Sequence, residues 1–287
     1  MSTPHEPNAS ASPNPNATVL VLGGTGKTGR RIVERLAARN VPVRVGARGA
    51  SPRFDWHDEA TWDASLDGVR AVYVNYAPDL AVPGATDAIR AFVDRASQRG
   101  VAHLVLLSGR GEAEAQACER IVQESGLDWT VVRASWLAQN FSEGAFVDMV
   151  RAGQITLPAS EVREPFVDVD DIAAVAVAAL TEPGHAGAVY EVTGPRLMTF
   201  AEAAEALSEA AGRTIAYVPI PHDAFVDGVR ASGAPKEVTW LMDYLFTTVL
   251  DGRNAYLTDG VERALGRPPK DFADYARETA TTGVWSA

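Results

Sequence analysis

Short apolar runs alternate with longer amphipathic segments along the first half of the chain. The apolar runs predict strands at residues 18–22, 41–47, 69–75, 102–108 and 128–134. Segments 28–39 and 88–99 instead repeat apolar residues three and four positions apart, which predicts helices with one core-facing side. Strands alternating with helices are typical of a parallel sheet covered on both faces. The pattern therefore predicts an α/β fold with a Rossmann-type, doubly wound parallel sheet.

The pattern changes after Trp136 to longer helical stretches and fewer strands. Strands are expected at 164–169 and 188–193, and helices at 201–211, 235–250 and 271–279. We expect a tail rich in Pro, Ser and Asn at 1–16 that is disordered, a Rossmann domain at 17–160 with returning segments near 165–195, and a smaller helix-rich lobe at 196–287. Ligands of doubly wound sheets bind outside the carboxyl ends of the strands, so this lobe is expected to cover the site.

Composition narrows the classes of function. A net charge of -11 and an isoelectric point near 5.0 argue against a nucleic-acid partner, because phosphate backbones attract basic surfaces. The single cysteine, Cys118, cannot form an internal disulfide, and no Cys/His cluster has metal-ligand spacing. Residues 172–180 are too few to cross a bilayer, and the tail lacks the apolar core of a signal peptide. We expect a cytoplasmic protein with no metal and no membrane partner, whose oligomeric state stays open.

A glycine-rich loop joins the first strand to the first helix. The segment 23–29 reads GGTGKTG, which gives the G-x-x-G-x-x-G spacing of short-chain dehydrogenases. Glycines there permit a tight turn, close approach to a pyrophosphate, and close packing of helix on strand. An ATP-binding P-loop would need a glycine at position 21, where Val21 stands. The loop therefore predicts a dinucleotide site.

Arg48 follows the second strand at the position that distinguishes two cofactors. An acidic residue there holds the ribose hydroxyl of NAD, whereas an arginine accommodates the 2′-phosphate of NADP. Lys27 adds a second cation in the glycine loop. We therefore expect NADP(H), with NAD(H) less favoured; the alternative is that Arg48 is only a solvated strand end. Asp55 and Trp56 stand where such folds contact adenine, although a plain surface-loop role fits them equally well.

The usual catalytic pairs are missing from the sequence. None of the lysines has a tyrosine four positions before it, so the Tyr-x-x-x-Lys proton donor is absent. No G-x-S-x-G nucleophile motif is present, and His103 within an apolar run is interpreted as structural. Asp168, Asp170 and Asp171 are expected to cap a helix that starts near Ile172, in preference to a metal site. No catalytic residue is therefore assigned.

Several segments together resemble the NmrA-like branch of atypical short-chain dehydrogenases, and within it the ergot-alkaloid-type reductases, the festuclavine and agroclavine dehydrogenases. The segments are GGTGKTGRRIVERL at 23–36, FDWHDEATW at 54–62, VYVNYAP at 72–78, ESGLDWTVVRASWLAQNFSEG at 124–144, PFVDVDDIA at 165–173, YEVTGP at 190–195 and LGRPPKDFADYA at 265–276. The resemblance covers nearly the whole chain from Thr18 onward. It implies roles for three groups of residues. The residues expected to line the phosphates are Gly23, Thr25, Gly26, Lys27, Thr28 and Gly29. The residues expected near the ribose and nicotinamide are Tyr76, Ala77, Pro78, Ser108 and Gly109. The residues expected to border the substrate are Trp136, Asn140, Phe141, Trp240 and Tyr244.

One position departs from the pattern of this branch. Many of its reductases carry a histidine or lysine four residues before the glutamate that corresponds to Glu119, and here that position is Ala115. Ergot-type reductases reduce an iminium, which accepts hydride without a proton donor. The sequence thus favours an NADPH-dependent reductase that transfers hydride to a small or medium-sized apolar organic molecule. The group that accepts the hydride is expected to be an imine or iminium, an activated C=C bond or a quinone-like group. The alternatives are a noncatalytic NADP(H)-sensing regulator, or an isomerase or epimerase that uses bound NADP.

Overall fold

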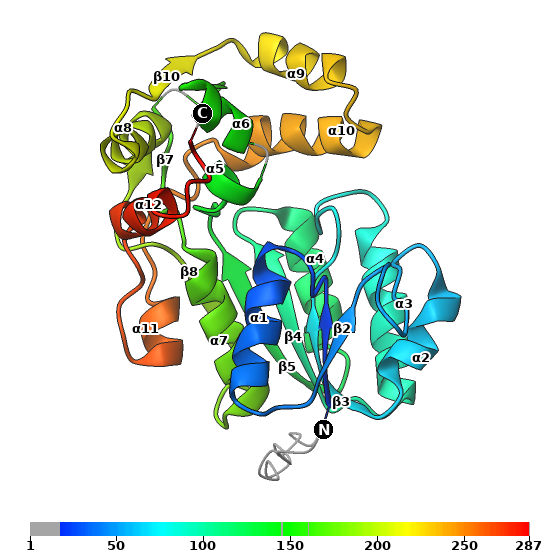
Figure 1. Ribbon diagram of the computed structural model, residues 1–287. Helices are drawn as coiled ribbons and strands as arrows, with labels where there is room; N and C mark the ends of the chain where they lie inside the picture. The colour runs from blue at the N-terminus through cyan, green and yellow to red at the C-terminus, as the bar shows by residue number, and fades with distance from the viewer. Residues whose placement is uncertain (1–17, 145, 160, 287) are drawn as a thin grey trace, which may run out of the picture.

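A parallel six-stranded sheet forms the centre of the protein (Figure 1). The structure, a computed structural model, describes residues 18–144, 146–159 and 161–286, so the tail expected at 1–16 lies outside the described residues. The strand order is β2 (Val43–Gly46), β1 (Thr18–Leu22), β3 (Val69–Val74), β4 (His103–Gly109), β5 (Asp128–Ala134) and β8 (Ala188–Val192), with every pair parallel. The prediction of a doubly wound α/β fold is confirmed.

Helices cover both faces of this sheet. One face carries α1 (Lys27–Ala38) and α7 (Val169–Thr181), with α11 (Gly260–Leu265) beside α7. The other carries α2 (Trp62–Leu66), preceded by the turn η1 (Glu59–Thr61), α3 (Ala85–Gln98) and α4 (Ala113–Gln123). Successive strand residues point to opposite faces, so Leu20 and Leu22 pack toward α3 and α4 while Val19 and Val21 pack toward α1 and α7. Burial on both faces explains why the strands are continuous apolar runs.

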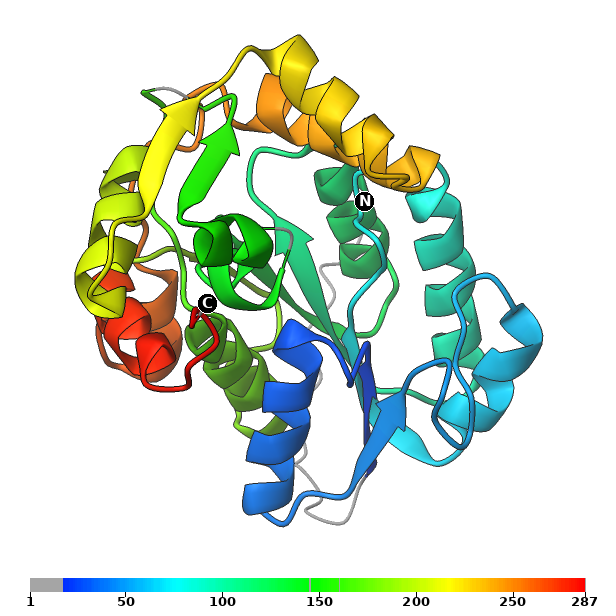
Figure 2. The same ribbon diagram turned by 45° about the horizontal axis from the view of Figure 1, so that its top comes forward.

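A second lobe lies over the carboxyl ends of the strands (Figures 1 and 2). Its aromatic core contains Phe141, Phe166, Phe200 and Phe272, all fully or almost fully buried. The lobe has two small sheets, β10 (Ala216–Pro219) with β6 (Gln154–Leu157) and β7 (Arg163–Glu164) with β9 (Met198–Thr199). Its helices are α5 (Asn140–Glu143), α6 (Val147–Ala152), α8 (Phe200–Ala211), α9 (His222–Ala231), α10 (Lys236–Tyr244), the π-helical turn η2 (Leu245–Val249) and α12 (Phe272–Ala280).

Three expectations need correction. The strand expected at 164–169 is reduced to β7 and a single bridge between Leu137 and Val167, because α7 already begins at Val169. The Asp168 carboxylate caps that helix by accepting a hydrogen bond from the Asp170 amide at 2.7 Å. The helix expected at 235–250 ends at Tyr244 and continues as η2. The packing does not follow a boundary at 160 either, since residues 138–159 contribute to the core of the second lobe.

Candidate functional site

The glycine loop between β1 and α1 has the geometry of a phosphate cradle. Gly23 has a positive φ of 64°, and its amide donates to the Gly46 carbonyl of β2 at 2.9 Å. A Cβ on Gly29 would lie 2.1 Å from the Gly23 carbonyl oxygen, so only glycine lets α1 pack this closely on the turn. Among the described residues no side chain caps α1, and its first turn contains no acid. The first amides of α1 are therefore available to an anion.

A cavity of about 470 Å³ extends from this loop along the carboxyl ends of β3, β4 and β5 to the second lobe. Its volume falls within the range of roughly 300 to 1,000 Å³ that is usual for small-molecule sites. The residues that line it are Gly26, Lys27, Thr28, Asn75, Tyr76, Ala77, Pro78, Asp79, Leu80, Leu107, Ser108, Gly109, Arg110, Glu112, Ala134, Ser135, Trp136, Leu137, Asn140, Phe146, Glu164, Leu241, Met242, Leu245, Val249 and Asn254.

Most residues expected to contact the cofactor share this cavity. Eight of them line its wall: Gly26, Lys27, Thr28, Tyr76, Ala77, Pro78, Ser108 and Gly109. Gly23, Thr25 and Gly29 shape the same loop without reaching the wall. The Lys27 ammonium donates to Asn140 Oδ1 at 2.7 Å, and burial lowers the pKa of this lysine. Lys27 thereby joins the glycine loop to α5 of the second lobe.

Arg48, Asp55 and Trp56 lie outside the cavity wall. Arg48 is exposed in the turn after β2, and no hydrogen bond or ion pair to it is found within the described residues. The Asp55 carboxylate accepts from the His57 amide at 3.1 Å and from Arg53 at 2.6 Å. The Trp56 indole donates to the Asn75 carbonyl at 3.0 Å, and its ring packs 5.0 Å from that of Tyr76. Asp55 and Trp56 thus have local partners of the kind that a structured surface loop provides.

The residues expected at the substrate separate into two groups. Trp136 and Asn140 line the cavity, and the buried Trp136 Nε1 has no partner within the described part of the chain. Phe141 is fully buried and packs on Phe166 and Phe272 instead of bordering the cavity. Trp240 and Tyr244 stack on each other with ring centres 5.2 Å apart and are not part of the wall.

The second lobe presents other residues to the cavity. Leu241, Met242, Leu245 and Val249 of α10 and η2 form its apolar side, and the sequence analysis missed them. Leu241, Leu245 and Val249 recur four positions apart, as residues on one face of a helix do. That periodicity was a usable signal, although it does not distinguish a cavity wall from a core-facing stripe.

Buried acids form a second group that sequence reasoning missed. Glu112, at the start of α4, and Asp79, after β3, both line the cavity, and burial, followed by the nearby charge of Asp79, raises the pKa of Glu112. Glu164 is only 2% exposed, and burial raises its pKa to about 7. The Ser135 hydroxyl donates to Glu164 Oε2 at 3.2 Å, whereas Glu164 Oε1 has no partner among described residues. Acidic residues are too common on surfaces for sequence alone to mark these as buried.

A buried ionic network supports the floor of the cavity. Glu119 is 2% exposed, accepts from the Ser108 hydroxyl at 2.6 Å, and pairs with Arg133 through bonds of 2.5 and 2.9 Å. Arg110 pairs with Glu191 at 2.7 Å and lies over the ring of Tyr256. These pairs fix the ends of β4 and β5, from which the cavity residues project.

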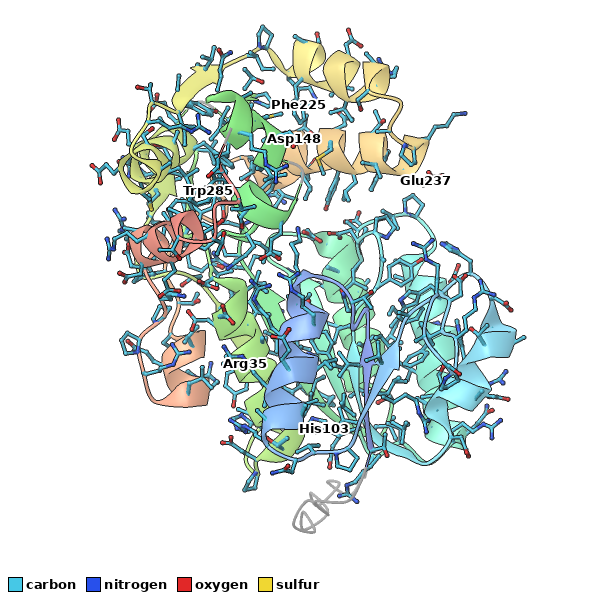
Figure 3. All side chains as sticks on the ribbon, viewed as in Figure 1. Arg35, His103, Asp148, Phe225, Glu237 and Trp285 are labelled. Atoms are coloured by element: carbon cyan, nitrogen blue, oxygen red, sulfur yellow. The ribbon has the colours of Figure 1, made fainter. Side chains whose placement is uncertain are left out.

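His103 lies at the first residue of β4, at the end of the sheet remote from Phe225 and Trp285 of the second lobe (Figure 3). Its Nε2 lies 3.0 Å from the Thr130 hydroxyl, and burial lowers its pKa to about 4. This contact is consistent with the structural role expected for His103. Within the described ranges, no group of His, Cys, Asp and Glu has the arrangement of a metal site. No helix in that part of the chain combines the length and apolarity needed to span a bilayer.

Comparison with known proteins identifies the family. Residues 23–183 match the family described as NAD(P)H-binding. The chain belongs to this family. It is 33% identical to an NAD(P)H azoreductase from Xenophilus azovorans, over 91% of this chain and 98% of the relative, and 32% identical to agroclavine dehydrogenase from Claviceps fusiformis, over 93% and 98%. Both relatives are named as a reductase or a dehydrogenase, and the similarity of the chain to ergot-type dehydrogenases is confirmed.

The fold is also found in NmrA, a negative transcriptional regulator solved in complex with NAD. The TM-score is 0.68 at 15% identity, covering 94% of this chain and 97% of NmrA. The NmrA-like architecture expected from the sequence is confirmed. At this identity the likeness concerns the fold alone, and whether the chain reduces a substrate or regulates through its cofactor depends on the site.

Proposed function

We propose that the protein is an NADPH-dependent reductase that transfers hydride to a small or medium-sized apolar acceptor carrying a C=N, activated C=C or quinone group. The observation that supports this most directly is the composition of the cavity. One end begins at Gly26, Lys27 and Thr28, where α1 presents free amides, and the other ends at the apolar side chains of α10 and η2. A cavity that is polar at one end and apolar at the other suits a charged cofactor and an apolar acceptor side by side.

The chain's own residues supply binding, orientation and exclusion of water. The first amides of α1 would bind the pyrophosphate, and the absence of a Cβ at Gly29 lets α1 pack close to the turn. When bound, the cofactor supplies the hydride. Ser108 and Gly109 at the end of β4, with Tyr76 after β3, line the part of the cavity where the nicotinamide would lie. Leu245 and its neighbours on the second lobe shield the opposite side from water.

The choice of NADPH over NADH rests on Arg48. Its side chain is exposed after β2 and has no partner in the described chain, so it is available to a 2′-phosphate. Lys27 supports the choice less, because its ammonium is already bonded to Asn140. Arg48→Ala should weaken NADPH binding at least tenfold and NADH binding less than threefold, as expected when one charge-assisted hydrogen bond is lost. Arg53→Ala, on the same loop, is the matched control; equal losses for both cofactors would refute the assignment.

The reaction is tested with purified protein, NADPH and a panel of cyclic imines, quinones and enones. Loss of reduced-nicotinamide absorbance with matching product supports the reductase. Tight, redox-selective cofactor binding with no turnover across the panel would instead support the NADP(H)-sensing regulator. Product that forms without net consumption of NADPH would indicate an isomerase or epimerase. The azoreductase relative favours the first outcome.

A further inference from the structure

Glu112 and Asp79 lie near each other in the cavity wall. They come from the carboxyl ends of neighbouring strands, Asp79 from the loop after β3 and Glu112 from the turn between β4 and α4. Glu112 is 6% exposed, and both residues line the cavity. Asp79 is less enclosed and adjoins the exposed Ala77 and Pro78. The pair therefore connects the interior of the cavity to its rim.

Two carboxyl groups that are close together and buried repel each other when both are ionised, which favours a proton on one of them. Burial raises the pKa of Glu112 to about 9 and also raises that of Asp79. The other charged groups that face Glu112 are Glu114 and Glu119, which act in the same direction, and Tyr244 is bonded to Glu114 nearby. Within the described residues no cation pairs with Glu112. The pair is thus held with a proton at neutral pH.

The position of the Glu112 carboxyl directs it toward the reacting end of the cavity. A Cβ built on Gly109 would lie 2.3 Å from its Oε1 and 2.7 Å from its Oε2, so the carboxyl occupies space that only a glycine leaves open at the end of β4. Its buried Oε2 has no donor partner among the residues that the structure describes. Gly109 is one of the residues that we assign to the nicotinamide. An acid is thus placed beside the atoms that would react.

We propose that Glu112 is the catalytic acid that protonates uncharged acceptors, and that Asp79 relays the replacement proton from solvent. This inference rests on the proposed reductase function. For a neutral imine, the carbon of the C=N bond takes the hydride that the reduced cofactor supplies, and the nitrogen lone pair takes the proton as the Glu112 O–H bond breaks. The products are an amine, the oxidised cofactor and the Glu112 carboxylate. Glu112 regains its proton through Asp79, so one proton from solvent is consumed in each turnover.

A second buried acid provides the matched control. Glu164 also lines the cavity. Burial raises its pKa to about 7, and the positive charge of Arg110 and the hydrogen bond from the Ser135 hydroxyl act in the opposite direction. At about pH 8.5 Glu164 is therefore mostly ionised, whereas Glu112 still mostly holds its proton. Glu164→Gln should therefore leave acid catalysis intact.

The test uses a pair of acceptors that differ in whether they need a proton. 3,4-Dihydroisoquinoline must be protonated on nitrogen, whereas its N-methyl iminium salt is a permanent cation. At about pH 8.5, Glu112→Gln should lower kcat for the neutral imine about 100-fold or more, the usual contribution of a general acid. It should change kcat for the iminium salt less than threefold, and Glu164→Gln should preserve the wild-type ratio. Equal loss on both acceptors, or no loss on the imine, would overturn the role of Glu112.

Wild-type turnover separates this inference from the proposed function. If the wild-type protein reduces neither member of the pair, nor any acceptor of the panel, the proposed function fails.

The proton itself is observed without turnover by infrared spectroscopy. At pH 8 the protein should show the C=O stretch of a buried protonated carboxyl that is absent from Glu112→Gln and present in Glu164→Gln. If the spectra of the wild-type protein and of Glu112→Gln do not differ by such a band, the proposal is overturned, whether or not an acceptor is reduced.

Discussion

Replacement of Gly29 by alanine tests the geometry of the cofactor loop. The new Cβ would lie 2.1 Å from the Gly23 carbonyl oxygen and 2.8 Å from the Gly24 Cα, both shorter than ordinary contact, and both neighbours are backbone. The loop and α1 must therefore separate. Loss of one charge-assisted hydrogen bond to a phosphate costs about 1.5 to 3 kcal/mol, so Kd for NADPH should rise roughly 10- to 150-fold.

The measurement is cofactor titration by nicotinamide fluorescence, with the midpoint of thermal unfolding recorded for each variant. Two other glycines provide a graded series. A Cβ on Gly49 meets nothing within 4 Å, and one on Gly26 comes no closer than 3.2 Å to the Gly23 oxygen. Affinity should fall in the order wild type and Gly49→Ala, then Gly26→Ala, then Gly29→Ala. If folded Gly29→Ala binds NADPH as tightly as Gly49→Ala does, the reasoning about the loop is refuted.

Three further variants test the supports of the site. Glu119→Gln removes the negative charge and one of the two acceptor oxygens that Arg133 and Ser108 share. The free energy of unfolding in urea should therefore fall by about 3 kcal/mol, and a loss below about 1 kcal/mol would contradict the pairing. Because burial raises the pKa of Glu164 to about 7, the protonated form of this residue stabilises the folded protein at low pH. The free energy of unfolding should therefore fall by about 3 kcal/mol as pH rises from about 4.5 to about 7. Glu164→Gln should weaken this dependence of the free energy of unfolding on pH. An unchanged dependence would disprove the effect of burial on Glu164. Leu245→Trp should raise KM for the acceptor at least tenfold, while Kd for NADPH, measured by stopped-flow titration, stays within threefold. Equal losses of affinity for the acceptor and for NADPH would place Leu245 at the cofactor instead.

The first half of the fold was predictable because its signals are local. Strands buried on both faces are continuous apolar runs, and α1 carries its buried residues Ile32 and Leu36 on one side. The glycine loop was predictable for the same reason, since the steric demands at Gly23 and Gly29 involve residues adjacent in sequence.

The walls of the cavity depend on contacts between distant segments, which local pattern does not report. Phe141 and Trp136 are both aromatic residues near the end of β5, yet Phe141 turns into the core of the second lobe and Trp136 faces the cavity. The acidic pair was missed because Asp79 and Glu112 become neighbours only when β3 and β4 are placed side by side. A search for Tyr-x-x-x-Lys could not reveal an acid supplied by two separate loops.

The central claim, that the cavity brings a reduced nicotinamide and an organic acceptor together, is tested most directly by following the hydride. NADPH carrying deuterium on one face of nicotinamide C4, and then on the other, is incubated with the protein and the N-methyl-3,4-dihydroisoquinolinium salt, and the amine product is analysed by mass spectrometry. We predict transfer of one deuterium from only one of the two labelled cofactors. Unlabelled product from both cofactors, or no product from any acceptor of the panel despite tight NADPH binding, would contradict the account.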